Sequence, residues 1–260
     1  MGKSTQFWEP KMNKFYRIGQ IVPSSNVTME VEVPAMLSKA TLPKGKAFSF
    51  HSSRAPMKTV AKEELIRMNE HMKRCAKELM DAEMDIIASA CLVAIMCQGP
   101  GYHRVAEKMI AEAVGRNAPP VISSAGALIN SLQDIGVKKI SFIAPYISEL
   151  TRSVSEYIER EGIEVEDYIS LQIPSNIDVG QQDPMALREI VKKLKTNNVD
   201  AIVLSACVQL PSLPALDLVQ RQFEVPVLST ASATVFQILK GLKLPTHIPH
   251  SGGLLSGDFN

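Results

Sequence analysis

An internal repeat is the sequence feature that most constrains the fold of this chain. Three short stretches recur in the same order, "RIGQIVP", "IIASAC" and "PVISSA" at 17–23, 86–91 and 120–125, then "KISFIAP", "IVLSAC" and "PVLSTA" at 139–145, 202–207 and 226–231. One such match would carry little weight, but three matches in one order indicate two related units. The sequence therefore predicts two lobes of one fold, related by a pseudo-twofold axis.

Strand-like and helix-like segments alternate through both units. The run at 86–91 is apolar throughout, which is typical of a strand buried on both faces of a parallel sheet. Residues 62–82 and 183–198 carry apolar side chains at helical spacing. The alternation predicts an α/β fold in which helices flank a parallel sheet in each lobe. The expected divisions are a leader or disordered segment at 1–11, an N-terminal lobe at 12–125 completed by residues 232–260, and a C-terminal lobe at 126–231.

Composition excludes several classes of function. The chain has 28 basic and 27 acidic residues among 260, so nothing in its charge favours a nucleic acid or a membrane surface as partner. Its longest apolar run, 86–97, is too short to span a bilayer, and the N-terminus lacks the apolar core of a signal peptide. We expect a cytoplasmic protein whose four cysteines are reduced thiols. Zinc-ligand spacing, dinucleotide and phosphate loops are missing from the sequence, which predicts no metal and no cofactor.

The repeat also points to a site. Ligands of open parallel sheets bind beyond the carboxyl ends of the strands, where both Ser-Ala-Cys runs end. Cys91 and Cys207 are therefore expected to flank one small anionic ligand in the cleft between the lobes, although a free cysteine is often only a buried core residue. Asn26 and Tyr146 occupy matching places after the first strand of each unit, and Asn176 lies in a loop; each is a candidate donor to that ligand.

At this point the residues resemble a known family. The stretches "YRIGQIVPSSN", "ACLVAIM", "APY" and "SACVQLPSLPA" are similar to the aspartate/glutamate racemase superfamily and, within it, to the maleate cis-trans isomerases. The resemblance runs from Tyr16 to Gly257. It implies a cofactor-free conversion of maleate to fumarate by a cytoplasmic homodimer, and a place in nicotinate degradation. The site residues that it implies are Cys91 as nucleophile, Cys207 as proton donor, and Asn26, Tyr146, Asn176 and the backbone of Leu92, Val93, Val208 and Gln209 as holders of the carboxylates.

The chemistry of such a reaction agrees with what the resemblance implies. Addition of a thiolate to one alkene carbon leaves a single bond that rotates freely, and elimination then releases the trans isomer. One alternative is a two-cysteine amino-acid racemase, but Leu92 and Val93 follow the first cysteine where such racemases carry Asn-Thr. Arylmalonate decarboxylases keep only the second cysteine, so Cys91 argues against that activity. A non-catalytic binding protein for small diacids is the third alternative.

Overall fold

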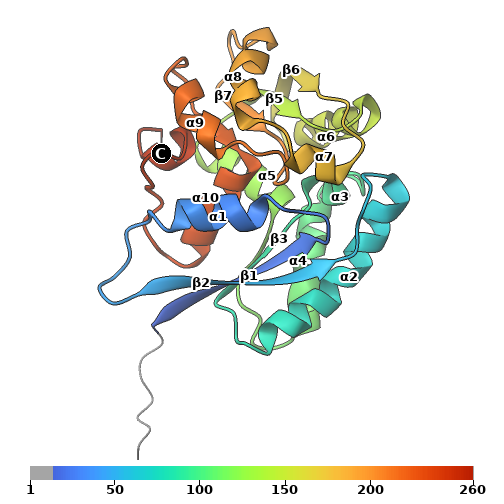
Figure 1. Ribbon diagram of the computed structural model, residues 1–260, viewed down its shortest axis with the longest axis vertical. Coiled ribbons are helices and arrows are strands. Elements are labelled where there is room, and N and C mark those ends of the chain that lie inside the picture. The colour runs from blue at the N-terminus through green and yellow to red at the C-terminus, as the bar shows by residue number, and fades with distance from the viewer. Residues whose placement is uncertain (1–13, 260) are drawn as a thin grey trace, which may run out of the picture.

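Two four-stranded parallel sheets form the framework of the protein, in a computed structural model that describes residues 14–259 (Figure 1). In the first sheet the order is β2-β1-β3-β4, and in the second it is β6-β5-β7-β8. Every strand pairs in parallel with its neighbours. The strands are β1 Phe15–Pro23, β2 Ala47–Ala55, β3 Ile86–Ser89, β4 Val121–Ser123, β5 Lys139–Ala144, β6 Glu164–Ser170, β7 Ala201–Ser205 and β8 Val227–Ser229. The equal order of the two sheets confirms the two related α/β lobes that the repeat predicts. The expected leader, 1–11, lies outside the described residues.

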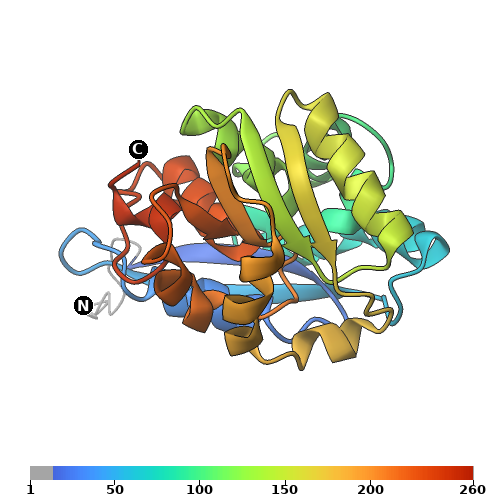
Figure 2. The ribbon, with the colours of Figure 1, turned by 90° about the horizontal axis from the view of Figure 1, so that it is seen from above.

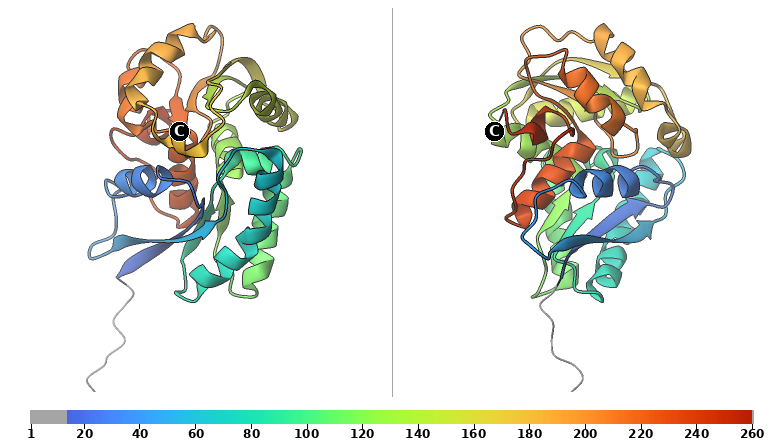
Figure 3. Two further views of the ribbon diagram at one scale, coloured as in Figure 1. Left: turned by 45° about the vertical axis from the view of Figure 1, so that its right-hand side comes forward. Right: turned by 60° about the vertical axis from the view of Figure 1, so that its left-hand side comes forward.

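Helices cover both faces of the first sheet. The long helix α2 (Lys62–Met80) packs with α4 (Tyr102–Val114) on one face, and α1 (Met29–Leu37) lies with α10 (Thr230–Gly241) on the other (Figure 3). The second sheet carries α6 (Ser148–Arg160) along β6 (Figure 2). The remaining helices are α3 Leu92–Met96, α5 Ser124–Asp134, α7 Asn176–Gly180, α8 Leu187–Ile190, α9 Leu213–Gln220 and α11 Gly253–Ser256, with 3-10 turns at Pro184–Ala186 and Val191–Lys193.

The helix α10 joins the lobes. It follows β8, the last strand of the second sheet, yet it packs against α1, β3 and β4 of the first lobe and along α5. In Figure 1 this helix (red) lies beside α1 (blue), between the two sheets. Its residues are buried from Thr230 to Leu239, so an almost entirely buried helix fills the junction. Two sheets are thereby held around a common layer of helices.

Two stretches differ from the sequence-based expectation. Residues 183–198, expected as one helix, form α8 between two 3-10 turns, although Leu187, Val191 and Leu194 still point inward at helical spacing. The strand β6 is not evident in the sequence, because it lies at a sheet edge and its residues alternate between exposed and half-buried. Within the described residues, no helix is both long and apolar enough to cross a bilayer.

Candidate active site

Cys91 lies where β3 passes into a helix. The strand ends at Ser89, and Cys91 is the N-cap residue of α3, whose first two residues are Leu92 and Val93. The first turn of a helix leaves N–H groups without partners inside the helix, and its dipole favours negative charge there. The N–H groups of Val93 and Ala94 point to the sulfur of Cys91. The local fold therefore provides donors for a thiolate at this position.

Burial nevertheless keeps Cys91 protonated. Loss of hydration raises the pKa of the Cys91 thiol to about 12, with a further contribution from the neighbouring Cys207. The two N–H groups oppose this increase. The Cys91 thiol is therefore predominantly protonated at neutral pH.

Cys207 follows β7 in the second lobe and has a different set of neighbours. Its sulfur accepts the N–H of Gln209 at 3.3 Å, and the hydroxyl of Ser205 donates to the Cys207 carbonyl at 2.9 Å. Burial raises the pKa of Cys207, while the Tyr146 hydroxyl and the N–H groups of Gln209 and Leu210 favour the thiolate. These donors partly offset the cost of a buried thiolate at Cys207.

Tyr146 comes directly after β5 and is almost completely buried. Its hydroxyl donates to the carbonyl oxygen of Ala206 at 3.0 Å, next to Cys207. Burial, followed by the two nearby thiols, raises the pKa of Tyr146 well above its usual value. The side chain is therefore an uncharged phenol at neutral pH.

Asn26 presents a free donor. Its Oδ1 atom accepts the N–H groups of Thr28 at 3.0 Å and Met29 at 2.9 Å, in a turn that leads into α1. Its Nδ2 atom is buried and has no hydrogen-bond partner in the structure. Buried polar atoms are nearly always paired, so an unpaired amide at a cavity wall indicates a place for an acceptor of a bound molecule.

Asn176 and Gln209 join segments of both lobes. The Asn176 Nδ2 atom donates to Ser25 Oγ at 2.8 Å. The side chain of Gln209 accepts the N–H of Val27 at 2.9 Å and donates to the carbonyl groups of Ser25 at 3.1 Å and Asn176 at 2.8 Å. The side-chain amide of Gln209 is therefore occupied by the protein.

One small, largely enclosed cavity of about 10 Å³ brings together all of the residues expected from the sequence. Its walls contain no Asp, Glu, Lys, Arg or His side chain of the described chain. The lining residues are Pro23, Asn26, Val60, Cys91, Leu92, Val93, Tyr146, Asn176, Cys207, Val208 and Gln209. Two thiols thus share a small closed space with neutral hydrogen-bond donors.

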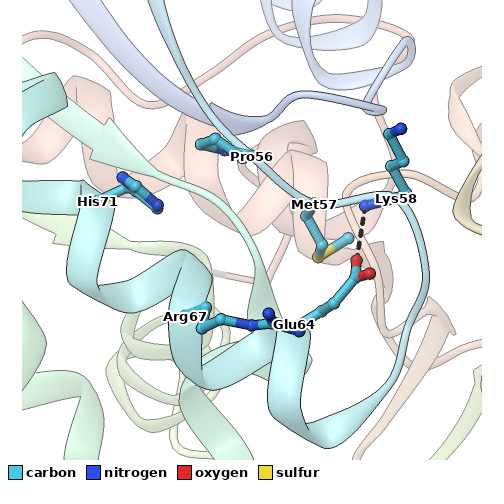
Figure 4. Close-up of a pocket in the computed structure, with 6 residues that line it drawn as sticks. All are labelled: Pro56, Met57, Lys58, Glu64, Arg67 and His71. Carbon is cyan, nitrogen blue, oxygen red and sulfur yellow. Dashed lines mark hydrogen bonds between the residues drawn. The ribbon is translucent and has the colours of Figure 1, made fainter.

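Val60 is a lining residue that the sequence did not reveal. It lies between β2 and α2, in a segment whose N–H at Val60 donates to the Pro174 carbonyl at 3.4 Å. The carboxylate of Glu64 accepts the N–H group of Lys58 at 2.8 Å (Figure 4) and that of Thr59 at 2.9 Å. A lone valine in a polar stretch gives no signal for a site, because its place above the cavity depends on contacts with the other lobe.

Comparison with known proteins agrees with this geometry. Residues 18–255 match a protein family described as arylmalonate decarboxylase. The maleate isomerase of Geobacillus stearothermophilus is 58% identical over 252 residues, which cover 95% of this chain and 100% of that protein. The chain belongs to the maleate isomerases.

Solved structures of maleate isomerases share the fold. A crystal structure of the Pseudomonas putida S16 enzyme with maleate, in which one cysteine is replaced by alanine, superimposes with a TM-score of 0.91 at 49% identity and covers 94% of this chain and 99% of that one. A Nocardia farcinica maleate cis-trans isomerase with one cysteine replaced by serine contains a covalently bound succinylcysteine intermediate; it has a TM-score of 0.89 at 41% identity, with 94% and 99% of the two chains covered. Family members thus bind maleate and form a covalent bond to cysteine.

Proposed function

We propose that this protein converts maleate to fumarate without a cofactor, through a succinyl group bound covalently to Cys91. The observation that carries the proposal is the enclosed cavity in which Cys91 and Cys207, one from each lobe, lie among neutral donors. The covalent succinylcysteine of the Nocardia farcinica relative supports the same chemistry.

The reaction needs temporary removal of the double bond. Cys91 sulfur bonds to one alkene carbon, and Cys207 gives its proton to the other. Cys207 regains a proton as Cys91 loses its own, so the net change is addition of one S–H bond across the double bond. Rotation about the new single bond brings the carboxylates apart. The reverse steps then break the S–C bond, restore both thiols and release fumarate.

The different neighbours of the two cysteines support their roles. The α3 N–H groups beside Cys91 stabilise negative charge on an attacking sulfur. Cys207 has Tyr146, Gln209 and Leu210 as donors once its proton has gone. Donors of this kind that act on developing charge are worth about 2.7–4 kcal/mol each, or ~10²–10³ in rate.

The carboxylates of the substrate would be held by neutral groups. Asn26 Nδ2 is an unpaired donor, and the first turn of α3 supplies backbone N–H groups. We assign the backbone of Val208 and Gln209 and the side chains of Tyr146 and Asn176 to the same task. A cavity without an acidic side chain offers no partner for an ammonium group, which disfavours an amino-acid racemase.

The experiment is incubation of the purified protein with maleate alone, with fumarate followed by proton NMR. We expect fumarate from the wild type and none from Cys91→Ala. Mass spectrometry of Cys207→Ala should trap an adduct with the mass of one maleic acid on the Cys91 peptide. An adduct on Cys207 in the wild type would reverse the two roles, and failure of the wild type to form fumarate would refute the proposal. The alternatives have their own assays. Decarboxylation of phenylmalonate would indicate a decarboxylase, and racemisation of aspartate would indicate a racemase. A wild type that forms no fumarate, with a diacid affinity that Cys91→Ala retains, would indicate a binding protein.

The wider setting is proposed on the resemblance alone. We place the protein in the cytoplasm as a homodimer, in a route that degrades nicotinate. Size-exclusion chromatography with light scattering tests the dimer, and a monomeric mass would exclude it.

A further inference from the structure

Glu32 is a buried carboxylate that the proposed reaction does not use. It lies in α1 of the first lobe and is only 5% exposed. Its Oε1 atom accepts the N–H groups of Ser212 and Leu213, both at 2.6 Å, and its Oε2 atom accepts the Ser212 hydroxyl at 3.2 Å. These donors belong to the second lobe, at the start of α9. Burial of a charged carboxylate costs free energy of folding, so the position of Glu32 between the lobes requires a specific explanation.

The segment that Glu32 holds is the one that carries Cys207. Only the residues 208–211 separate Cys207 from Ser212. One helical turn before Glu32, the Thr28 hydroxyl donates to the carbonyl of Gln209 at 2.8 Å. Thr28 and Glu32 are four residues apart and therefore lie on one face of the chain entering α1. Together they attach the middle and the end of the 207–212 segment to the opposite lobe.

The same part of the first lobe also holds the proposed substrate donor. Asn26 is fixed by hydrogen bonds to the N–H groups of Thr28 and Met29, at the beginning of α1. The proposed carboxylate donor, Asn26, and the segment that carries the proposed proton donor, Cys207, are therefore both attached to α1 and the residues that lead into it. Cys91, in contrast, is held by α3 of its own lobe.

We propose that Glu32 is a positioning residue, which fixes Cys207 relative to the substrate by anchoring the 207–212 segment to α1. The assignment rests on the proposed function. Proton transfer by a placed side chain contributes ~10²–10⁴ in rate, and a displacement of about 1 Å can cost ~10². Loss of the anchor should therefore lower kcat more than it raises KM, because Asn26, Tyr146 and Asn176, which are also assigned to the carboxylates, lie outside the 207–212 segment. Burial raises the pKa of Glu32. In its ionised form the carboxylate adds to the effect of burial in raising the pKa of Cys207, whose other ionisable neighbours are Tyr146 and Cys91.

The test compares Glu32→Leu with Glu32→Gln. Leucine removes both acceptor atoms, whereas glutamine keeps an Oε1 atom for both N–H groups, removes the charge and replaces the weaker acceptor of the Ser212 hydroxyl by an NH2 group. We expect kcat to fall about 100-fold in Glu32→Leu and less than about 10-fold in Glu32→Gln, with KM within about threefold of wild type in both. The alkaline limb of kcat should move to lower pH in Glu32→Gln. Glu189→Gln, at an exposed carboxylate of α8, is the matched control and should behave as wild type.

Hydrogen exchange of residues 207–213 gives a readout independent of activity. Exchange in this segment should accelerate in Glu32→Leu and not in Glu32→Gln, with the β1 and β3 amides unchanged. Equal kcat in the leucine and glutamine variants, a main effect on KM, or unchanged exchange in Glu32→Leu would overturn the assignment. Absence of fumarate with the wild type would refute the proposed function instead, and the exchange experiment would still decide whether Glu32 anchors the segment.

Discussion

The unpaired amide of Asn26 leads to a sharp prediction, in which aspartate is worse than alanine. The substitution Asn26→Asp keeps an oxygen for the N–H groups of Thr28 and Met29, but it replaces the free Nδ2 donor by an acceptor. Asn26→Ala removes both functions. The two variants therefore separate the turn that Asn26 stabilises from the donor that it presents.

The magnitudes follow from the contents of the cavity. Loss of one hydrogen bond to a charged group costs about 1.5–3 kcal/mol, which is about 10–150-fold in kcat/KM for Asn26→Ala. In Asn26→Asp a carboxylate would in addition face a carboxylate of the substrate. At about 4 Å and an effective dielectric constant of about 20, this repulsion is about 4 kcal/mol, a further ~10³-fold. The lining offers no cationic side chain to reduce it.

Steady-state kinetics with maleate at pH 8 provide the measurement, with circular dichroism as the check on folding. We expect kcat/KM to fall in the order wild type, Asn26→Ala, Asn26→Asp. Acidification should partly restore Asn26→Asp, because a protonated carboxyl group again donates a hydrogen bond, and should not restore Asn26→Ala. An aspartate variant as active as the alanine variant at pH 8 would refute the reasoning that Nδ2 faces an anion.

Three further predictions concern the thiols and the junction between the lobes. With a pKa of about 12, roughly one Cys91 in 10⁴ is a thiolate at pH 8. Iodoacetamide should therefore label Cys91 in the folded protein at least about 1,000-fold more slowly than in the urea-unfolded protein. Equal labelling rates, measured by peptide mapping, would contradict the burial of this thiol. Because the unfolded state releases this proton first, near pH 9, the stabilisation due to Cys91 is present below pH 9 and is lost as the pH rises toward 12. The unfolding free energy of the wild type relative to Cys91→Ala should therefore fall by about 2 kcal/mol between pH 7 and pH 10.5, by urea titration, and a constant difference would exclude the raised pKa. Gln209→Leu leaves one N–H and two carbonyl groups of neighbouring segments without partners, and should lower the unfolding free energy by about 3 kcal/mol; a loss below about 1 kcal/mol would show that water replaces these bonds.

The parts of the molecule that were predictable are those that one local pattern encodes. Continuous apolar runs mark β3 and β7, and the repeat places Cys91 and Cys207 at equivalent strand ends. The parallel arrangement then requires both thiols to lie at the ligand-binding edge. The residues that follow these strand ends could be predicted as site residues, because the topology of a parallel sheet alone determines which edge binds the ligand.

The remaining parts depend on contacts between distant segments. The helix α1, with Pro34 inside it and hardly any segregation of apolar residues to one face, resembles neither a typical amphipathic helix nor a strand. Glu32 reads in the sequence as an ordinary surface glutamate, since only the second lobe provides its donors. Val60 reaches the cavity through the contact of its segment with Pro174. No periodicity within one segment can report such relations.

The path of α10 also has a consequence for how the protein is made. This helix packs over α1, β3 and β4 of the first lobe, but its residues are numbered 230–241. A ribosome has therefore synthesised both sheets before the segment that covers this face of the first one emerges. The N-terminal lobe, although it is made first, completes its core only after the second sheet has been made, and the nascent chain carries an uncovered apolar surface until residues 230–241 have emerged.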